Sequence, residues 1–207
     1  MKQLLAIVFI GLVFGGYGQL TDERDGKTYK TVIIGEQEWM AENLAFIPDS
    51  GVFSTYRNDT TKISKYGYLY DWETAKEVCP TGWHLPSNAE WFVLTNFLGE
   101  EVAGTKMKSN TGWQHNGNGT NESGFNGFPG GYSLWGSIDH VLSYGCWWSS
   151  SNNASPNYNI QIPSEKKAFA WSRRLSCCDF NNEDIRSKVI KASSRKSAAL
   201  SVRCIKD

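Results

Sequence analysis

The side chains best suited to acid–base or metal chemistry near neutral pH are histidines, and this chain has three: His84, His115 and His140. They are scattered along the sequence. His84 lies in the motif richest in structural signals, but no Cys, Asp or Glu accompanies it at the spacing of a zinc site. We therefore expect His84 to pack near a helix start and donate to the backbone, and we predict no zinc site.

Two further patterns could carry chemistry but lack a necessary partner. Residues 116–122 (NGNGTNE) alternate oxygen-bearing side chains as calcium loops do, yet a single carboxylate compensates poorly for a divalent charge. Residues 149–151 are consecutive serines without a Gly-x-Ser-x-Gly elbow or an evident histidine base, so we expect them to form backbone hydrogen bonds. The sequence therefore predicts no metal, no cofactor and no catalytic residue.

Five cysteines in an exported chain would favour disulfides, because thiols outside the cytosol oxidise and stay oxidised. Sequence alone does not choose among the possible pairings. We favour a bridge between Cys79 and Cys204, since it would close nearly the whole domain and stabilise it by ~2–5 kcal/mol. We expect Cys177 or Cys178 to reach Cys146 rather than to bond to its neighbour in a strained ring.

Exposed aromatic residues are the best indication of function, because tryptophan faces stack on sugar rings and anchor protein interfaces. Trp113, Trp135 and Trp147 are the candidates, and Asn118 and Asn121 could supply polar contacts from the same region. The alternative is that most of the nine tryptophans fill the core of a loop-rich domain.

Among the elements that must position these residues, a helix over residues 88–98 is the best defined. Ser87 and Glu90 have the capping-box spacing, and Gly99 offers a left-handed stop. The apolar residues within it recur at helical spacing and predict one buried stripe: Trp91, Leu94 and Leu98.

Three other regions have clear signals. Residues 29–34 and 37–40, joined by Gly35 and Glu36, predict an opening hairpin. A short helix is expected from Asp71, which can cap it, to Pro80, which must end it. Residues 110–131 contain seven glycines and five asparagines, so we predict a long ordered loop.

The last third of the chain alternates as β-strands do. Apolar residues recur at every second position in residues 158–162 and 200–204, and in 169–175 with Arg173 as the exception, so each segment should bury one face. The polar stretch 181–196 should be a surface connection.

The first residues indicate an export signal. Lys2 gives a positive start, residues 4–14 an apolar run, and residues 16–18 small residues at the cleavage spacing, so we expect a signal peptide over 1–18. The apolar run is too short to cross the ~30 Å hydrocarbon core of a bilayer, and no later segment is apolar enough to span. A single domain over residues 19–207 should remain, exported to the periplasm, cell surface or medium.

The charge balance limits the class of partner. Without Lys2, 20 of the 21 basic residues remain against 21 acidic ones, so the net charge is near −1. Such balance gives no reason to expect nucleic acid or an anionic membrane surface as partner.

Eight motifs occur in an order that closely resembles one family. They are DGKTY at 25–29, WMAENL at 39–44, YGYLY at 66–70, CPTGWHLP at 79–86, NESGF at 121–125, PGGY at 129–132, WWSS at 147–150 and SVRC at 201–204. The family is the Fibrobacter succinogenes major paralogous domain of exported bacterial proteins, and the resemblance covers about residues 22–206. It implies export but no particular reaction.

A more distant resemblance implies the fold. Residues 83–86 (WHLP), the late WSS element and the terminal Arg-Cys strand look like the C-type lectin-like scaffold, in the branch of the formylglycine-generating enzymes. The resemblance implies an α+β fold, with two short helices against small twisted antiparallel sheets and a long irregular loop region. In that scaffold a bridge from Cys79 to Cys204 is topologically sensible.

The sequence departs from the active members of that scaffold. It lacks the Glu-Pro-Asn or Gln-Pro-Asp triplet of calcium-dependent lectins, and Cys177 and Cys178 are adjacent, which is a poor geometry for two thiolates holding copper. We therefore expect a non-enzymatic recognition or structural module that binds a glycan or cell-surface protein through residues 110–151. A copper-dependent oxidase and a calcium-dependent lectin are the alternatives.

Overall fold

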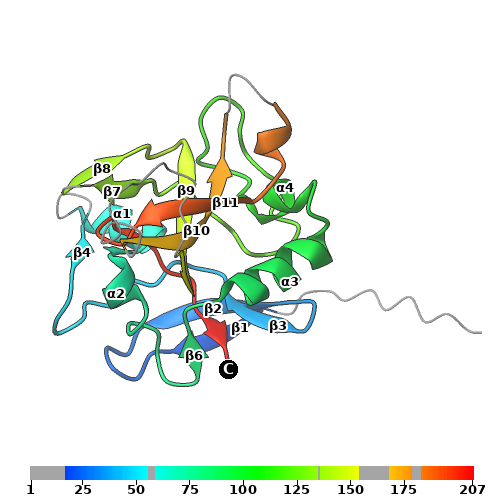
Figure 1. Cartoon of the computed structure of the whole chain (residues 1–207). Helices are drawn as coiled ribbons and strands as arrows, with labels where there is room; N and C mark the ends of the chain where they lie inside the picture. The colour runs from blue at the N-terminus through cyan, green and yellow to red at the C-terminus, as the bar shows by residue number, and fades with distance from the viewer. Residues whose placement is uncertain (1–16, 56–58, 135, 154–167, 179–182) are drawn as a thin grey trace, which may run out of the picture.

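The computed structural model describes residues 17–55, 59–134, 136–153, 168–178 and 183–207. Within them the chain is mixed α+β, with two main sheets and a few short helices (Figure 1). The expected α+β class is confirmed. The expected strand over 158–162 lies outside the described residues.

The first sheet has five strands in the order β1-β2-β3-β13-β6, and every neighbouring pair is antiparallel. The predicted hairpin of β2 and β3 forms, and Gly35 adopts a φ of 63° in its turn, a conformation that glycine accepts readily, but the unpredicted strand β1 precedes it and pairs with β2. The five strands are β1 (Tyr17–Thr21), β2 (Thr28–Ile34), β3 (Gln37–Met40), β6 (Trp83–His84) and β13 (Ile205–Lys206).

The second sheet has six strands in the order β11-β10-β9-β12-β5-β4, and only the β12–β9 pair is parallel. Its strands are β4 (Phe53–Ser54), β5 (Leu69–Tyr70), β9 (Tyr144–Asn152), β10 (Phe169–Ser176), β11 (Ile190–Arg195) and β12 (Leu200–Ser201). A small hairpin lies beside it, made of β7 (Tyr132–Leu134) and β8 (Ser137–Asp139).

The prediction of a surface connection over residues 181–196 was wrong for residues 190–195, which form β11 at the edge of the six-stranded sheet. Four of its six residues are lysine, serine or arginine, a polar composition that an edge strand tolerates. A 3₁₀ turn over Glu183–Arg186 precedes it.

The helices are short. The predicted one is α3 (Asn88–Leu98), which has the full Ser87–Glu90 capping box and ends at Gly99 with a φ of 86°. Asp71 caps α2 (Trp72–Ala75), which is shorter than the sequence suggested. Helices α1 (Thr60–Tyr66) and α4 (Ala103–Met107) were not predicted. No helix in the described ranges is long and apolar enough to cross a membrane.

Helix α3 joins the two sheets. Trp91 on α3 packs against Trp39 on β3 with ring centroids 4.9 Å apart, and its indole N–H donates to the Trp148 carbonyl on β9 at 3.3 Å. Both main apolar clusters contain aromatic rings that are fully buried, and burial of each such ring contributes ~1.5–3 kcal/mol. In Figure 1 the five-stranded sheet lies below α3 and the six-stranded sheet above it.

A buried arginine holds the predicted loop 110–131 onto this core. Arg203 is 1% exposed, and its Nε donates to Asn43 Oδ1 at 2.7 Å. Its Nη1 donates to the carbonyls of Met40 and Phe125, and its Nη2 to the carbonyl of Asn126 at 3.2 Å. Burial lowers the pKa of Arg203 to about 9, partly opposed by Glu42, so the guanidinium stays charged at neutral pH.

Candidate ligand cavity

The structure joins Cys79 to Cys204, the pair that loop closure favoured, with Cα atoms 5.9 Å apart. Cys79 follows α2, and Cys204 lies between β12 and β13. The bridge therefore ties the connection between α2 and β6 to the segment that runs from one sheet into the other.

The expected bond to Cys146 was wrong. Cys177 and Cys178 are bonded to each other, and Cys146 is free and buried. The strand register explains this, because Cys146 lies opposite Arg174 on β10, whereas the Cys177 amide reaches Ser143. Three residues along a strand span ~10 Å, beyond the Cα separation that a disulfide allows.

His84 contacts carboxylates, where we expected backbone. Its Nδ1 lies 2.6 Å from Asp207 Oδ1, and its Nε2 lies 2.7 Å from Glu90 Oε1. Burial lowers the pKa of His84, but the hydrogen bonds to Asp207 and Glu90 outweigh it, so the pKa is raised from 6.5. Glu90 also accepts the Ser87 amide of the helix cap, so His84 links the start of α3 to β6 and the residue after β13.

The tryptophans proposed as ligand contacts fill the core instead. Trp113 is 5% exposed and donates to Ser109 Oγ and the Gly127 carbonyl, both at 3.1 Å. Trp147 is 1% exposed and donates to Asn43 Oδ1 at 2.9 Å. Neither offers an indole face to a ligand, so both assignments are corrected. Trp135 lies outside the described residues.

The two candidate asparagines shape the loop. Asn118 Oδ1 accepts the Trp113 amide at 3.0 Å, and Asn121, at a φ of 52°, accepts the Asn126 amide at 2.7 Å. Their carbonyl oxygens are therefore engaged within the loop. In the residues that the structure describes, no group of three or more His, Cys, Asp or Glu side chains could hold a metal ion.

The serines after Trp148 also serve structural roles. Ser149 is fully buried, and its hydroxyl accepts the Ser151 amide at 3.2 Å. The Ser151 hydroxyl accepts the Asn88 amide at the start of α3 at 2.9 Å. These contacts match the expectation of backbone hydrogen bonding.

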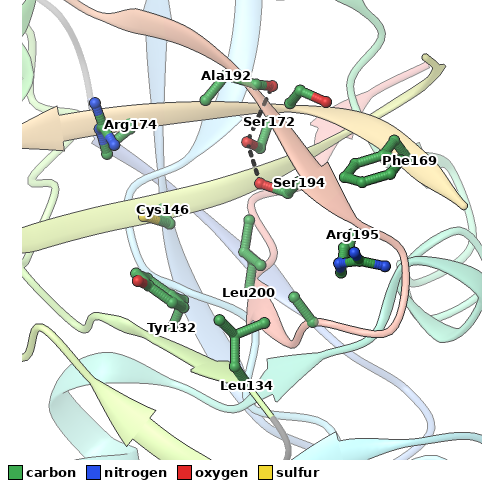
Figure 2. A pocket seen from close by; sticks show the side chains of 12 residues that line it. Tyr132, Leu134, Cys146, Phe169, Ser172, Arg174, Ala192, Ser194, Arg195 and Leu200 are labelled. Carbon is green, nitrogen blue, oxygen red and sulfur yellow. Dashed lines mark hydrogen bonds between the residues drawn. The ribbon is translucent and has the colours of Figure 1, made fainter. Parts of the chain in front are cut away.

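The structure brings a different set of residues together around a cavity of about 520 Å³ on the face of the six-stranded sheet away from α3 (Figure 2). Strands β7, β9, β10, β11 and β12 all contribute to its walls. The lining side chains that determine which ligands the cavity could bind are Tyr132, Cys146, Ser172, Arg174, Arg195 and Leu200.

Strand geometry explains why Ser172 and Arg174 reach this cavity. Alternate residues of a strand point to opposite faces. Arg173, between them, points toward α3, where it is 5% exposed and donates to Asn88 Oδ1 at 2.9 Å. Arg173 is therefore buried between β10 and α3, on the opposite face of the strand from the cavity.

The cavity is electropositive. Figure 2 shows Arg174 and Arg195 on opposite sides, with Leu200 and a hydrogen-bonded pair of hydroxyls, Ser172 and Ser194, between them. No Asp or Glu belongs to the cavity wall within the described ranges. Burial raises the pKa of Cys146 to about 12, with Arg174 opposing, so this thiol is neutral at physiological pH.

Sequence reasoning did not single out these residues as a site. The available signal was the spacing of Ser172 and Arg174, two polar residues on one face of a strand whose other face carries Trp171, Arg173 and Leu175. Finding the site also required knowing that β11 pairs with β10, which its polar composition did not reveal.

The model of the Fibrobacter succinogenes major domain matches residues 32–206. The chain belongs to this family. The match runs from within β2 to the end of β13, so the Fibrobacter succinogenes major domain includes the cavity and the Cys79–Cys204 bridge. The chain matches no curated protein and no solved structure.

Proposed function

We propose that this Fibrobacter succinogenes major domain is an exported, non-enzymatic recognition module with a C-type lectin-like fold. It holds a glycan or a cell-surface protein on the face that contains the cavity. The WHLP and WSS motifs and the bridge between α2 and the last strands support the fold assignment.

The cavity is the observation that carries the proposal. At about 520 Å³ it has the size of a small-molecule or sugar site, and it combines an apolar floor with a few placed polar groups. Tyr132 and Leu134 come from the 110–151 region, so the cavity lies at one border of the face expected to bind. Guanidinium, hydroxyl and apolar groups suit recognition of a ligand.

Export rests on the leader-like residues 1–18, with cleavage near Gly18. In the structure β1 already begins at Tyr17, which pairs with Val32. Mass spectrometry of the mature N-terminus would test this part of the proposal. A mature chain that retains the apolar leader would contradict cleavage.

Arrays of glycans and of extracellular proteins test the binding function directly. The purified mature chain should bind at least one class of ligand, and mass spectrometry should recover that ligand chemically unchanged. Failure to bind any glycan or protein, or conversion of the ligand into a product, would overturn the proposal.

The alternatives make different predictions for the same preparation. A copper-dependent oxidase would need Cys177 and Cys178 as two free thiols, whereas the structure bonds them to each other beneath Gly117. A calcium-dependent lectin would melt at a higher temperature when calcium is added. Our proposal predicts an unchanged melting temperature with calcium.

A further inference from the structure

We propose that the cavity between Arg174 and Arg195 is a carboxylate-binding site that receives an acidic group of the ligand. The inference rests on the proposed recognition function and names the chemistry of its ligand. The carboxylate could belong to an acidic sugar within a glycan or to a free organic acid.

Arg174 is the main anchor. Its Nε is buried without a hydrogen-bond partner among the described residues, although a buried donor is normally paired. A carboxylate pairs in a planar, two-bond geometry with an edge of a guanidinium group. The unpaired Nε–H is one half of such an edge, and a carboxylate entering beside Arg174 from the cavity would supply its missing acceptor.

A stack of rings fixes the direction of Arg174. Its Cζ lies 5.0 Å from the centroid of Tyr144, which stacks on His140 at 4.9 Å, and His140 stacks on Tyr132 at 5.3 Å. Stacking of this kind limits the conformations that an arginine must lose on binding. The guanidinium is therefore preorganised for a planar anion.

The positive charges of Arg174 and Arg195 are not balanced by a carboxylate among the described residues of the cavity wall. Neither Arg174 nor Arg195 forms an ion pair with a carboxylate in the described part of the chain. Arg195 instead lies over the Phe169 ring at 5.2 Å. Two cations on opposite sides of a concave surface concentrate the positive potential there, which attracts an anionic ligand.

The remaining wall suits the rest of a sugar-sized or similarly small molecule. The Ser172 and Ser194 hydroxyls lie 2.8 Å apart, and Ser172 also donates to the Ala192 carbonyl at 3.3 Å. Such hydroxyls can exchange hydrogen bonds with ligand hydroxyl groups. Leu134 and Leu200 provide apolar area for the face of a ring.

Isothermal titration calorimetry with three probes tests the assignment. Digalacturonic acid carries the carboxylate on a sugar, its dimethyl ester removes the charge, and 3-phenylpropionate is a free organic acid. We expect one of the two acids to bind, and which one does identifies the source of the carboxylate. We expect the neutral ester to bind about tenfold more weakly or not at all.

Variants locate the binding. Arg174→Gln and Arg195→Gln should each weaken binding of the acid, with a loss of about tenfold or more for Arg174. Arg174→Lys keeps the charge without the planar fork and should give an intermediate affinity. Lys191→Gln is the matched control, because it removes one positive charge from β11 at a residue outside the cavity wall. Its affinity should stay within about twofold of the parent.

Melting curves show that each variant is folded before affinities are compared. Acid and ester binding equally well, or an acid whose affinity Arg174→Gln does not change, would overturn the carboxylate site while leaving the recognition function in place. Binding of neither acid, with an array ligand insensitive to both arginine variants, would also overturn it. An array without any bound ligand would instead reject the proposed function.

Discussion

Removal of the Cys79–Cys204 bridge should destabilise the domain more than any other single covalent change. The two cysteines are 125 residues apart in the sequence, so the bridge restricts most of the unfolded chain. The variant to make is Cys79→Ala/Cys204→Ala, which leaves the other three cysteines in place.

The magnitude follows from loop-closure entropy. With 125 residues in the closed loop, the chain-entropy relation gives about −16.5 cal/mol/K, or about 4.9 kcal/mol at 25 °C. A typical domain has about 5–15 kcal/mol of total stability, so this loss removes a large part of it. With a urea m-value of about 2.5 kcal/mol/M, the unfolding midpoint should fall by about 2 M.

Urea denaturation followed by tryptophan fluorescence measures this loss. The matched control is Cys177→Ala/Cys178→Ala, which also replaces two bonded cysteines but opens a ring between adjacent residues. Its midpoint should change much less. Equal midpoints for the two double variants, or a parent protein with Cys79 and Cys204 both reduced, would refute the reasoning.

Three further predictions concern single residues. Because the pKa of His84 is raised above 6.5 by Asp207 and Glu90 despite burial, its stabilising contribution is full below pH 6.5 and lost as pH rises through the folded pKa. His84→Gln should therefore lower the melting temperature more at about pH 5.5 than at about pH 9, and an equal loss at both would contradict the linkage. Burial raises the pKa of Cys146 to about 12, so in the folded protein it should react with a thiol reagent about a thousandfold more slowly than an ordinary thiol of pKa 9.0. The reaction should become fast only when the protein unfolds, and a fast reaction of the native protein would contradict the burial of Cys146. Arg203→Met leaves buried carbonyls unpaired at about 1–3 kcal/mol each, so urea unfolding should show a loss of at least about 3 kcal/mol, and a loss below about 1 kcal/mol would show that Arg203 does not hold the loop.

Local signals predicted those elements whose ends are set by neighbouring residues. Ser87, Glu90 and Gly99 define both ends of α3 through contacts within a few residues, and the structure reproduces the predicted bounds. The opening hairpin is similar, because Gly35 sets its turn. In both cases the deciding contacts are local in sequence.

The rest depended on contacts between distant segments. The polar strand β11 is stable because it pairs with β10, a partner that its own sequence does not specify. Trp113 and Trp147 are of the residue type that stacks on sugars at protein surfaces. In the structure, however, their indole N–H groups donate to buried acceptors on Gly127 and Asn43. Burial of an aromatic residue is decided by these tertiary partners.

The cysteine pairing shows the same division. Loop length favoured Cys79 and Cys204 without any structural knowledge. The partner of Cys177 depended on the register between β9 and β10, which places Cys146 too far along the ladder. Spacing in the sequence carries no information on that register.

A crystal structure of the mature chain with its tightest-binding acidic ligand tests the central claim most directly. Our account predicts the ligand chemically intact in the cavity, with a carboxylate oxygen within hydrogen-bonding distance of Arg174 Nε. A ligand bound elsewhere on the molecule, or one in the cavity whose charged group points away from both Arg174 and Arg195, would contradict it.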